Sequence, residues 1–262
     1  MSENRIPNPN PTPNQFQTPY SANPTVPASP VVQGVGVTPS ALGVKPDARL
    51  ANAFLTQAFM WMFAGLFVTA GVAYFVQSNA SLLNFARGSA FLLIMVQLGI
   101  ALGIMGAINR ISATVALGLF FIYAATLGIS IGYIVSFYST GSVATAFLSA
   151  SAMFGAAAIY GHVTKRSLSA LRPILFMGVF GLFIAMLVNI FLASSPITWI
   201  ISVIGVVLFT VLTAYDVQRI QSGAIAAQTG SMEKAAVIGA LQLYLDFINL
   251  FLFMLRLLGG RS

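Results

Sequence analysis

The chain has 262 residues, of which 58% are hydrophobic and only 6% are charged. An average soluble domain carries about 25% charged residues, so this composition excludes a soluble fold and predicts a membrane protein that crosses the bilayer several times. The net charge of +7 does not indicate nucleic acid as a partner, because the basic residues are scattered between apolar runs instead of forming a stripe.

Residues 1–48 differ in composition from the rest of the chain. They contain ten of the twelve prolines, mixed with Asn, Thr, Ser and Gln. Such a segment buries too little apolar surface to offset the entropy of ordering, so a disordered tail is predicted, with docking through its proline-rich stretches as the alternative. Its start has no apolar core of the kind that a signal peptide needs, and the first transmembrane helix is expected to direct insertion.

Residues 49–262 are expected to form an all-α transmembrane domain of seven helices. A transmembrane helix needs about 20 apolar residues, and seven such segments alternate with short polar breaks. They lie near Ala53–Val76, Ala90–Ile108, Ala113–Phe137, Val143–Tyr160, Ile174–Ala193, Ile197–Tyr215 and Ala235–Leu258. No extramembrane domain remains, so any function must lie within or between the helices.

Basic residues are distributed unequally between alternate loops. One side collects Lys45, Arg49, Arg110, Lys165, Arg166, Arg172, Arg219 and Lys234, and the other collects Arg87, Arg256 and Arg261. The positive-inside rule then predicts a cytoplasmic N-terminus, with the C-terminus outside if all seven segments span. If the last segment is re-entrant, both ends are cytoplasmic. The short loops favour a bacterial plasma (inner) membrane.

Small residues and one arginine stand out in the second and third segments. Gly99 with Gly103, and Gly128 with Gly132, are four residues apart, a spacing that lets helices approach closely in lipid. Arg110 ends the second segment on the side predicted to be cytoplasmic. It is a candidate functional residue, but an arginine at a helix C-terminus also suits the helix dipole and reaches the interface easily.

Two of the five acidic residues lie inside apolar segments. Glu3 and Asp47 fall in the tail and Glu233 falls in a loop, whereas Asp216 and Asp246 belong to the sixth and seventh helices. An ionised carboxylate at the centre of a membrane helix costs about 2.5–3.5 kcal/mol. Each of these two is therefore expected to be protonated, paired or exposed to a wet cavity.

Asp216 lies in the stretch TAYDVQRIQSG, near the cytoplasmic end of the sixth helix. A carboxylate near a helix C-terminus is disfavoured by the helix dipole, so Asp216 should have a partner. The alternative is an ordinary interfacial aspartate paired with Arg219, one turn along the helix. At 1.5 Å per residue, Asp216 is about 10 Å from the end of its helix and Asp246 about 16 Å from the start of its own, which places both toward the cytoplasmic side.

Asp246 interrupts the apolar stretch LYLDFINLFLFML. Gln242 and Asn249, at spacings of four and three residues, share its helical face, and the rest of the helix is apolar. One polar seam on an apolar helix predicts that this face looks into the helix bundle, onto a wet cavity or polar cluster. The alternative is a neutral aspartate that serves only as a hydrogen-bonding link between helices.

No pattern in the chain supports catalysis. It has no cysteine, no Walker-type loop and no G-x-S-x-G, and the lone His162 has no second ligand for a metal. Intramembrane aspartyl proteases carry glycine beside the catalytic aspartate, but the flanks here are AYDVQ and YLDFI. We therefore expect a protein that is not an enzyme and has no covalently bound cofactor.

Two motifs resemble a known family. ALQLYLDFINLFLFMLRLLG, residues 240–259, is similar to the C-terminal signature of the Bax inhibitor-1 family, and TAYDVQRI, residues 213–220, resembles the signature on its sixth helix. Val217 stands where that signature commonly has Thr. The resemblance covers roughly residues 50–259 and leaves the tail outside.

The resemblance implies a fold in which six helices surround a central, C-terminal seventh. It also implies a Ca²⁺ leak controlled by pH, in which Asp216 and Asp246 share a hydrogen bond and act as the pH sensor, and Arg110 contacts the pair as a latch. Ca²⁺ prefers oxygen ligands, so the two aspartates are a candidate Ca²⁺ site, with Ca²⁺ as the permeant ion.

The chemistry of two neighbouring carboxyl groups is consistent with this function. Two carboxylates held close cannot both ionise cheaply, and they titrate in two coupled steps. A shared proton would tie the sixth and seventh helices together, and its loss would add repulsion that opens the cytoplasmic end or admits Ca²⁺.

Two other functions remain open. Some bacterial relatives are associated with membrane proteases, so the chain could instead be a non-catalytic interaction protein that modulates a protease or a quality-control partner. Proton-coupled transport of a small solute also fits the aspartates but has no substrate signature.

Overall fold

The computed structural model describes residues 48–260, and their side chains from residue 52 onward. The predicted tail therefore lies outside the described residues, except for Ala48, where α1 begins. The described helices are α1 (Ala48–Gln77), α2 (Ala80–Gly88), α3 (Ala90–Ala107), α4 (Ala113–Val135), α5 (Thr140–Val163), the 3-10 turn η1 (Ser169–Leu171), α6 (Arg172–Leu192), α7 (Ser195–Gln221), α8 (Ala224–Thr229) and α9 (Met232–Leu258).

The prediction of an all-α membrane protein with seven spans is confirmed. Within the described range, seven helices (α1, α3, α4, α5, α6, α7 and α9) are long and apolar enough to cross a membrane. Sequence reasoning missed two short helices. α2 begins where the Asn79 side chain accepts from the Ser81 and Leu82 amides, and α8 is set off by Gly223 and Gly230, both in the left-handed conformation.

Serine side chains define the start of four spans. The first amides of a helix have no intrahelical acceptor, and a serine hydroxyl at the N-cap supplies one. This pattern starts α4, α5, α7 and α9, at Ser112, Ser139, Ser194 and Ser231 respectively. The caps place the polar breaks between spans and so fix which residues of each helix lie at bilayer depth.

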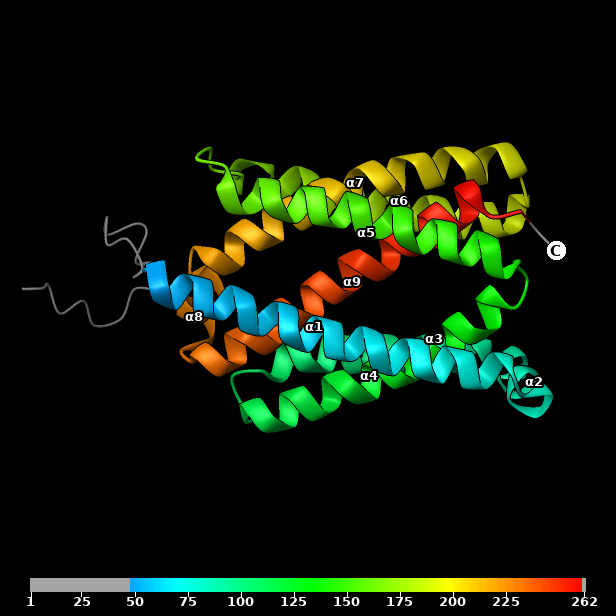
Figure 1. Cartoon of the computed structure of the whole chain (residues 1–262), viewed down its shortest axis with the longest axis horizontal. Coiled ribbons are helices and arrows are strands. Elements are labelled where there is room, and N and C mark those ends of the chain that lie inside the picture. Colours follow the sequence, from blue (N-terminus) through cyan, green and yellow to red (C-terminus); the bar gives the residue numbers. More distant parts are fainter. Residues whose placement is uncertain (1–47, 261–262) are drawn as a thin grey trace, which may run out of the picture. The chain divides into compact units, whose positions relative to one another are not determined.

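The spans form two groups joined by α9. α1 packs on α4 and α4 on α3, while α5 packs on α7 and α7 on α6. α9 crosses obliquely between the groups (Figure 1) and contacts α1, α4, α5 and α7 as well as α8. It is also the most buried described span: 67% of its most apolar stretch is buried, against 39% at most in the others.

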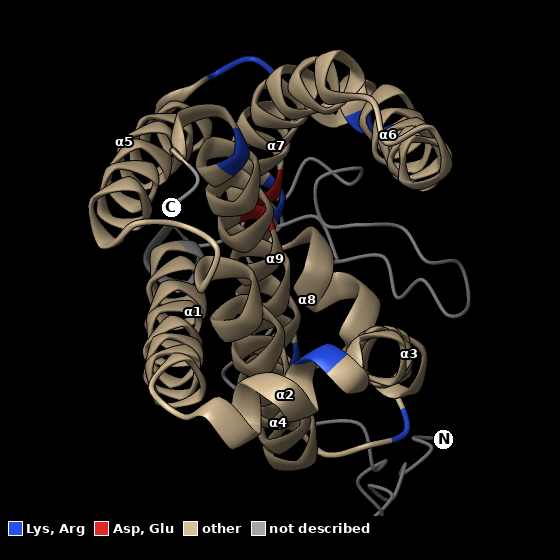
Figure 2. Ribbon diagram, turned by 90° about the vertical axis from the view of Figure 1, so that its right-hand side faces the viewer, with Lys and Arg blue, Asp and Glu red and all other residues tan. Residues whose placement is uncertain are grey.

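α3 and α6 lie at the edges of this arrangement. Each packs chiefly on its neighbour, α4 or α7, and within the described residues neither packs extensively on α9. In the end-on view of Figure 2, the two helices stand apart on the right-hand side, with α9 near the middle of the view. The seventh helix is therefore central, as expected, but only four of the other six spans pack directly against it.

The length and course of α9 favour a full crossing. It is a continuous helix of 27 residues, about 40 Å long at 1.5 Å per residue, and its end lies opposite the start of α1 (Figure 1). We use "basic end" for the end of the bundle where α3 finishes, α6 starts, α7 finishes and α9 starts. Six of the eight basic residues with described side chains belong to it: Arg110, Lys165, Arg166, Arg172, Arg219 and Lys234. That this end is cytoplasmic stays a prediction.

The two glycine pairs differ in their surroundings. A Cβ atom added at Gly128 would lie 2.9 Å from the Thr69 carbonyl oxygen, and one added at Gly132 would lie 2.9 Å from Val76 Cβ, so α4 and α1 are in close contact. At Gly99 and Gly103 nothing lies within 4 Å. The expected close packing is thus confirmed for the pair in α4 and wrong for the pair in α3, because α3 is an edge helix.

Candidate functional site

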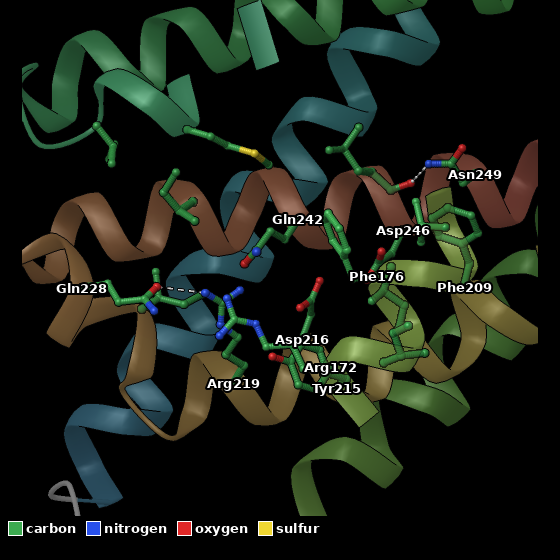
Figure 3. A pocket seen from close by; sticks show the side chains of 18 of the residues that line it. Arg172, Phe176, Phe209, Tyr215, Asp216, Arg219, Gln228, Gln242, Asp246 and Asn249 are labelled. Carbon is green, nitrogen blue, oxygen red and sulfur yellow. Dashed lines mark hydrogen bonds between the residues drawn. The ribbon is translucent and has the colours of Figure 1, made fainter. Parts of the chain in front are cut away.

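A cavity of about 950 Å³ lies at the basic end, beside α9. Its walls come from the end of α3, the start of α6, the second half of α7, the short helix α8 and the first two thirds of α9. The gap arises because α9 runs obliquely while α3 and α6 stay with their own groups. Figure 3 shows side chains from these elements converging on it.

The two aspartates singled out in the sequence both line this cavity. Asp216 comes from α7 and Asp246 from α9, and their exposed fractions are only 5% and 2%. Asp216 is about 7.5 Å from the end of α7 at Gln221, and Asp246 is about 21 Å from the start of α9 at Met232. Asp246 is deeper than expected because α9 begins one turn earlier than predicted. The oblique course of α9 brings the two to one cavity.

The polar seam of α9 faces the same space. Gln242 and Asn249 line the cavity with Asp246, and Asn249 Nδ2 donates to the Leu245 carbonyl oxygen at 2.8 Å. Two buried oxygen atoms, Gln242 Oε1 and Asp246 Oδ2, have no hydrogen-bond partner among the described residues. Buried acceptors without a partner are costly, so this seam favours a proton, water or a cation.

The carboxyl groups of Asp216 and Asp246 point into the shared cavity from opposite walls (Figure 3). That the two groups share a hydrogen bond, as the family resemblance implies, stays a prediction.

Arginines other than the predicted latch lie at the mouth of the cavity. Arg172, at the start of α6, and Arg219, near the end of α7, line it, whereas Arg110 is exposed in the turn after α3 and does not. Arg219 Nη2 donates to Gln228 Oε1 of α8 at 2.9 Å (Figure 3). The latch role of Arg110 stays a prediction, which Arg110→Gln would test.

Sequence reasoning did not assign Arg172 or the α8 residues Gln228 and Thr229 to the site. In the sequence, Arg172 serves only to predict orientation from the charges of the loops. The residues of α8 lie in the polar break between the sixth and seventh predicted spans. The sequence did contain a signal for α8. Glycine readily adopts the left-handed backbone conformation found at helix ends, and Gly223 and Gly230 lie on either side of this six-residue helix.

Aromatic packing closes the inner end of the cavity. Phe209 of α7 lines it, and the Phe253 ring of α9 lies 5.9 Å from the Phe209 ring, centroid to centroid. A Cβ atom added at Gly205 would lie 2.6 Å from the Phe253 ring, so α7 and α9 are in close contact there. The lining of the cavity thus extends from the basic end as far as Phe209 and Asn249.

The other face of α9 carries a hydrogen-bonded tyrosine instead of unsatisfied oxygen atoms. Tyr244 is fully buried, and its hydroxyl lies 2.6 Å from Thr69 Oγ1 of α1. The Thr69 hydroxyl in turn bonds the Ala124 carbonyl oxygen of α4 at 2.9 Å. The Tyr244 ring packs edge-on against Phe120 at 5.4 Å. This cluster ties α1, α4 and α9 together.

Comparisons with known proteins agree with the fold and the motifs. The family model described as "Inhibitor of apoptosis-promoting Bax1" matches residues 51–262. The chain is 38% identical over 224 residues to the inner membrane protein YbhL of Escherichia coli, covering 83% of this chain and 95% of that protein. It is also 41% identical over 210 residues to an uncharacterized protein of Deinococcus radiodurans, covering 80% and 91% of the two chains.

These features define a seven-span helical membrane protein with two buried aspartates beside its central helix. The chain belongs to the Bax inhibitor-1 family, because the family model covers the whole transmembrane domain and the relative from Escherichia coli matches over nearly its full length.

Proposed function

We propose that the protein is a pH-sensitive Ca²⁺ leak pathway of a plasma (inner) membrane, gated by Asp216 and Asp246. The observation that carries the proposal is the placing of two buried carboxyl groups, from different helices, on one cavity. The same cavity holds oxygen atoms of Gln242 and Asp246 that have no hydrogen-bond partner within residues 52–260. Ca²⁺ binds oxygen ligands, and carboxylate and amide oxygens are among its usual protein ligands. The basic end, where the cavity opens, is taken as cytoplasmic.

The charge state of the aspartate pair would control entry of the ion. With a proton on the pair, the cavity carries at most one negative charge from these groups. Loss of the proton leaves two carboxylates that repel each other and attract a divalent cation, as coupled acidic sites do. Ca²⁺ flux should therefore rise from about pH 5 to about pH 8. Arg172 and Arg219, at the mouth, are the charged groups that oppose cation entry.

Passage to the other side requires a change at the inner end. Phe209 and Phe253 fill the space between α7 and α9 beyond Asn249, and aromatic constrictions exclude hydrated ions. In this proposal the structure is a closed state. Repulsion between Asp216 and Asp246 would move α9 relative to α7 and displace Phe253.

Reconstitution in liposomes tests the proposal. Ca²⁺ entry would be followed with an enclosed dye from about pH 5 to about pH 8, for wild type, Asp216→Asn and Asp246→Asn. Glu233→Gln is a matched control, because Glu233 is an exposed carboxylate in the first turn of α9 that does not line the cavity. We expect a flux that rises with pH in wild type and in the control, and a flat profile in both aspartate variants.

Other outcomes have clear meanings. A flux that depends on pH equally in Asp246→Asn and in wild type would refute the gate. A folded wild type without any flux would favour the interaction protein that modulates a membrane protease. Deletion of residues 1–48 separates the two functions further, since a leak should survive it and a tail-mediated interaction should not.

A further inference from the structure

The polar cavity has a side wall that is incomplete. Its lining includes Met105 of α3 and Phe176 of α6, which are 42% and 74% exposed. α3 and α6 belong to different groups and do not pack on each other as neighbours (Figure 2). Both helices are spans, so the opening between them faces the bilayer and not water.

Two guanidinium groups lie where this opening meets the basic end. Arg172 and Arg219 reach the same end of the cavity, beside Gln228 (Figure 3). No ion pair within 4.0 Å involves either arginine among the side chains described for residues 52–260. Two neighbouring like charges repel, and an anion between them would remove that cost.

We propose that the opening between α3 and α6 binds an anionic phospholipid of the bilayer. Its phosphate lies between Arg172 and Arg219, and one acyl chain enters the cavity along Met105 and Phe176. Arginine suits phosphate because its planar donors form charge-assisted, bidentate hydrogen bonds.

The occupant is a lipid and not a soluble anion, because the charged and apolar parts of the lining are continuous. The arginines stand at the level where helices begin and end. Phe176 lies about one turn deeper than Arg172 along α6, and Met105 lies two residues inside the end of α3. A phospholipid has the same order of groups along its length. Basic pockets between transmembrane helices near one membrane surface bind lipid headgroups in this way.

A bound lipid would complete the wall of the cavity. Its acyl chain would separate the carboxyl groups of Asp216 and Asp246 from the hydrocarbon, and its phosphate would neutralise the arginines at the mouth. Lipid binding itself does not depend on the leak function, and the two are tested by different measurements.

Native mass spectrometry of the purified full chain tests lipid selectivity. Phosphatidylglycerol and phosphatidylcholine with identical acyl chains would be titrated separately, with glycerol phosphate as a soluble anion. We expect tight binding of phosphatidylglycerol only. In Arg172→Gln/Arg219→Gln its affinity should fall at least about tenfold, the loss expected from removing charge-assisted bonds to phosphate.

A matched control removes the same charge from the same end. Lys165→Gln/Arg166→Gln deletes two positive charges that do not line the cavity, and should change the affinity less than about twofold, since surface charges contribute little. An equal loss in this control, equal binding of both lipids, or tight binding of glycerol phosphate would each overturn the proposal.

Fluorescence quenching tests the acyl chain independently of the arginines. In a background with Trp61→Phe and Trp199→Phe, Phe176→Trp places the reporter in the opening and Met177→Trp places it at the same depth on a residue that is exposed but does not line the cavity. Vesicles of phosphatidylcholine would contain a small fraction of phosphatidylglycerol with brominated acyl chains. We expect quenching above the bulk fraction at Phe176→Trp only, and equal quenching at both positions would refute the site.

Discussion

The two faces of α9 treat their polar groups in opposite ways. Tyr244 and Asp246 are two residues apart, about 200° around the helix, and both are buried. The Tyr244 hydroxyl is hydrogen-bonded to Thr69 within a packed aromatic cluster, whereas Asp246 Oδ2 has no partner among the described residues and borders a cavity. One face of the central helix thus holds the fold together, and the other carries groups that the fold does not satisfy.

The difference between the two faces of α9 can be explained by the cost of burying polar groups. A buried polar group that is hydrogen-bonded contributes modestly to stability, while one without a partner lowers it by the cost of desolvation. Selection for stability alone would have no use for Asp246 in a helix that is otherwise apolar. Its position in α9 is explained if its carboxyl oxygen atoms bind a proton or a cation.

The largest change in unfolding free energy is expected from a substitution on the Tyr244 face of α9. Tyr244→Ala should lower the free energy of unfolding by about 3–5 kcal/mol, because it removes a fully buried ring and leaves a cavity. Equilibrium unfolding in mixed detergent micelles measures this. Tyr74→Ala, which removes a tyrosine that is 75% exposed on α1, should have little effect. A similar loss of unfolding free energy in both variants would show that the Tyr244 cluster does not stabilise the fold more than an exposed tyrosine does.

A second comparison uses two glycines that look alike in sequence. Gly205→Ala places a methyl group within 2.6 Å of the Phe253 ring, and such overpacking should lower the free energy of unfolding by about 1–3 kcal/mol. Gly99→Ala has nothing within 4 Å and should be neutral or slightly stabilising, since alanine favours a helix. The same unfolding assay applies, and destabilisation at Gly99 alone would contradict the packing described.

A smaller effect should come from the hydrogen bond between Tyr244 and Thr69. Thr69 uses its one proton on a backbone carbonyl, so Tyr244 is the donor between the two hydroxyl groups. Tyr244→Phe keeps the ring and should lower the free energy of unfolding by about 0.5–1.5 kcal/mol. In a double-mutant cycle with Thr69→Val, the two losses should not add. Full additivity would mean that the hydroxyl groups do not interact.

Much of the fold could be predicted because apolar length is a strong signal. Seven runs near 20 residues, separated by polar breaks, are enough to locate seven spans, and the confirmed bounds differ by a few residues at most of their ends. The structure likewise brings Asp216, Asp246, Gln242 and Asn249 to one cavity, since a polar seam on an apolar helix has few other places to face.

What the sequence could not give depends on which helices are neighbours. Spacing makes Gly99 and Gly128 equivalent, and only the edge position of α3 separates them. The sequence does not distinguish Tyr244 from the apolar residues around it. Its role depends on Thr69, which is 175 positions earlier and lies beside it only in the folded structure. Arg172 and Arg110 are both arginines at helix ends on the same side, and only the oblique course of α9 decides that Arg172 lines the cavity and Arg110 does not.

The smallest change in stability is expected from a substitution on the face of α9 that borders the cavity. Asp246→Asn is nearly isosteric, and Asp246 Oδ2 has no hydrogen-bond partner to lose among the described residues. The free energy of unfolding should therefore change by less than about 1 kcal/mol, because no hydrogen bond to Oδ2 is lost and the amide oxygen keeps an acceptor at the position of Oδ1. It is measured in the same assay as Tyr244→Ala.

The comparison is sharpest when stability and flux are measured on the same protein. In Asp246→Asn the fold should persist while the pH dependence of Ca²⁺ entry is lost, because an amide cannot give up the proton that controls the charge of the pair. If instead Asp246→Asn unfolds as readily as Tyr244→Ala, both faces of α9 are structural. Asp246 would then be a link between helices, and the cavity would need another explanation.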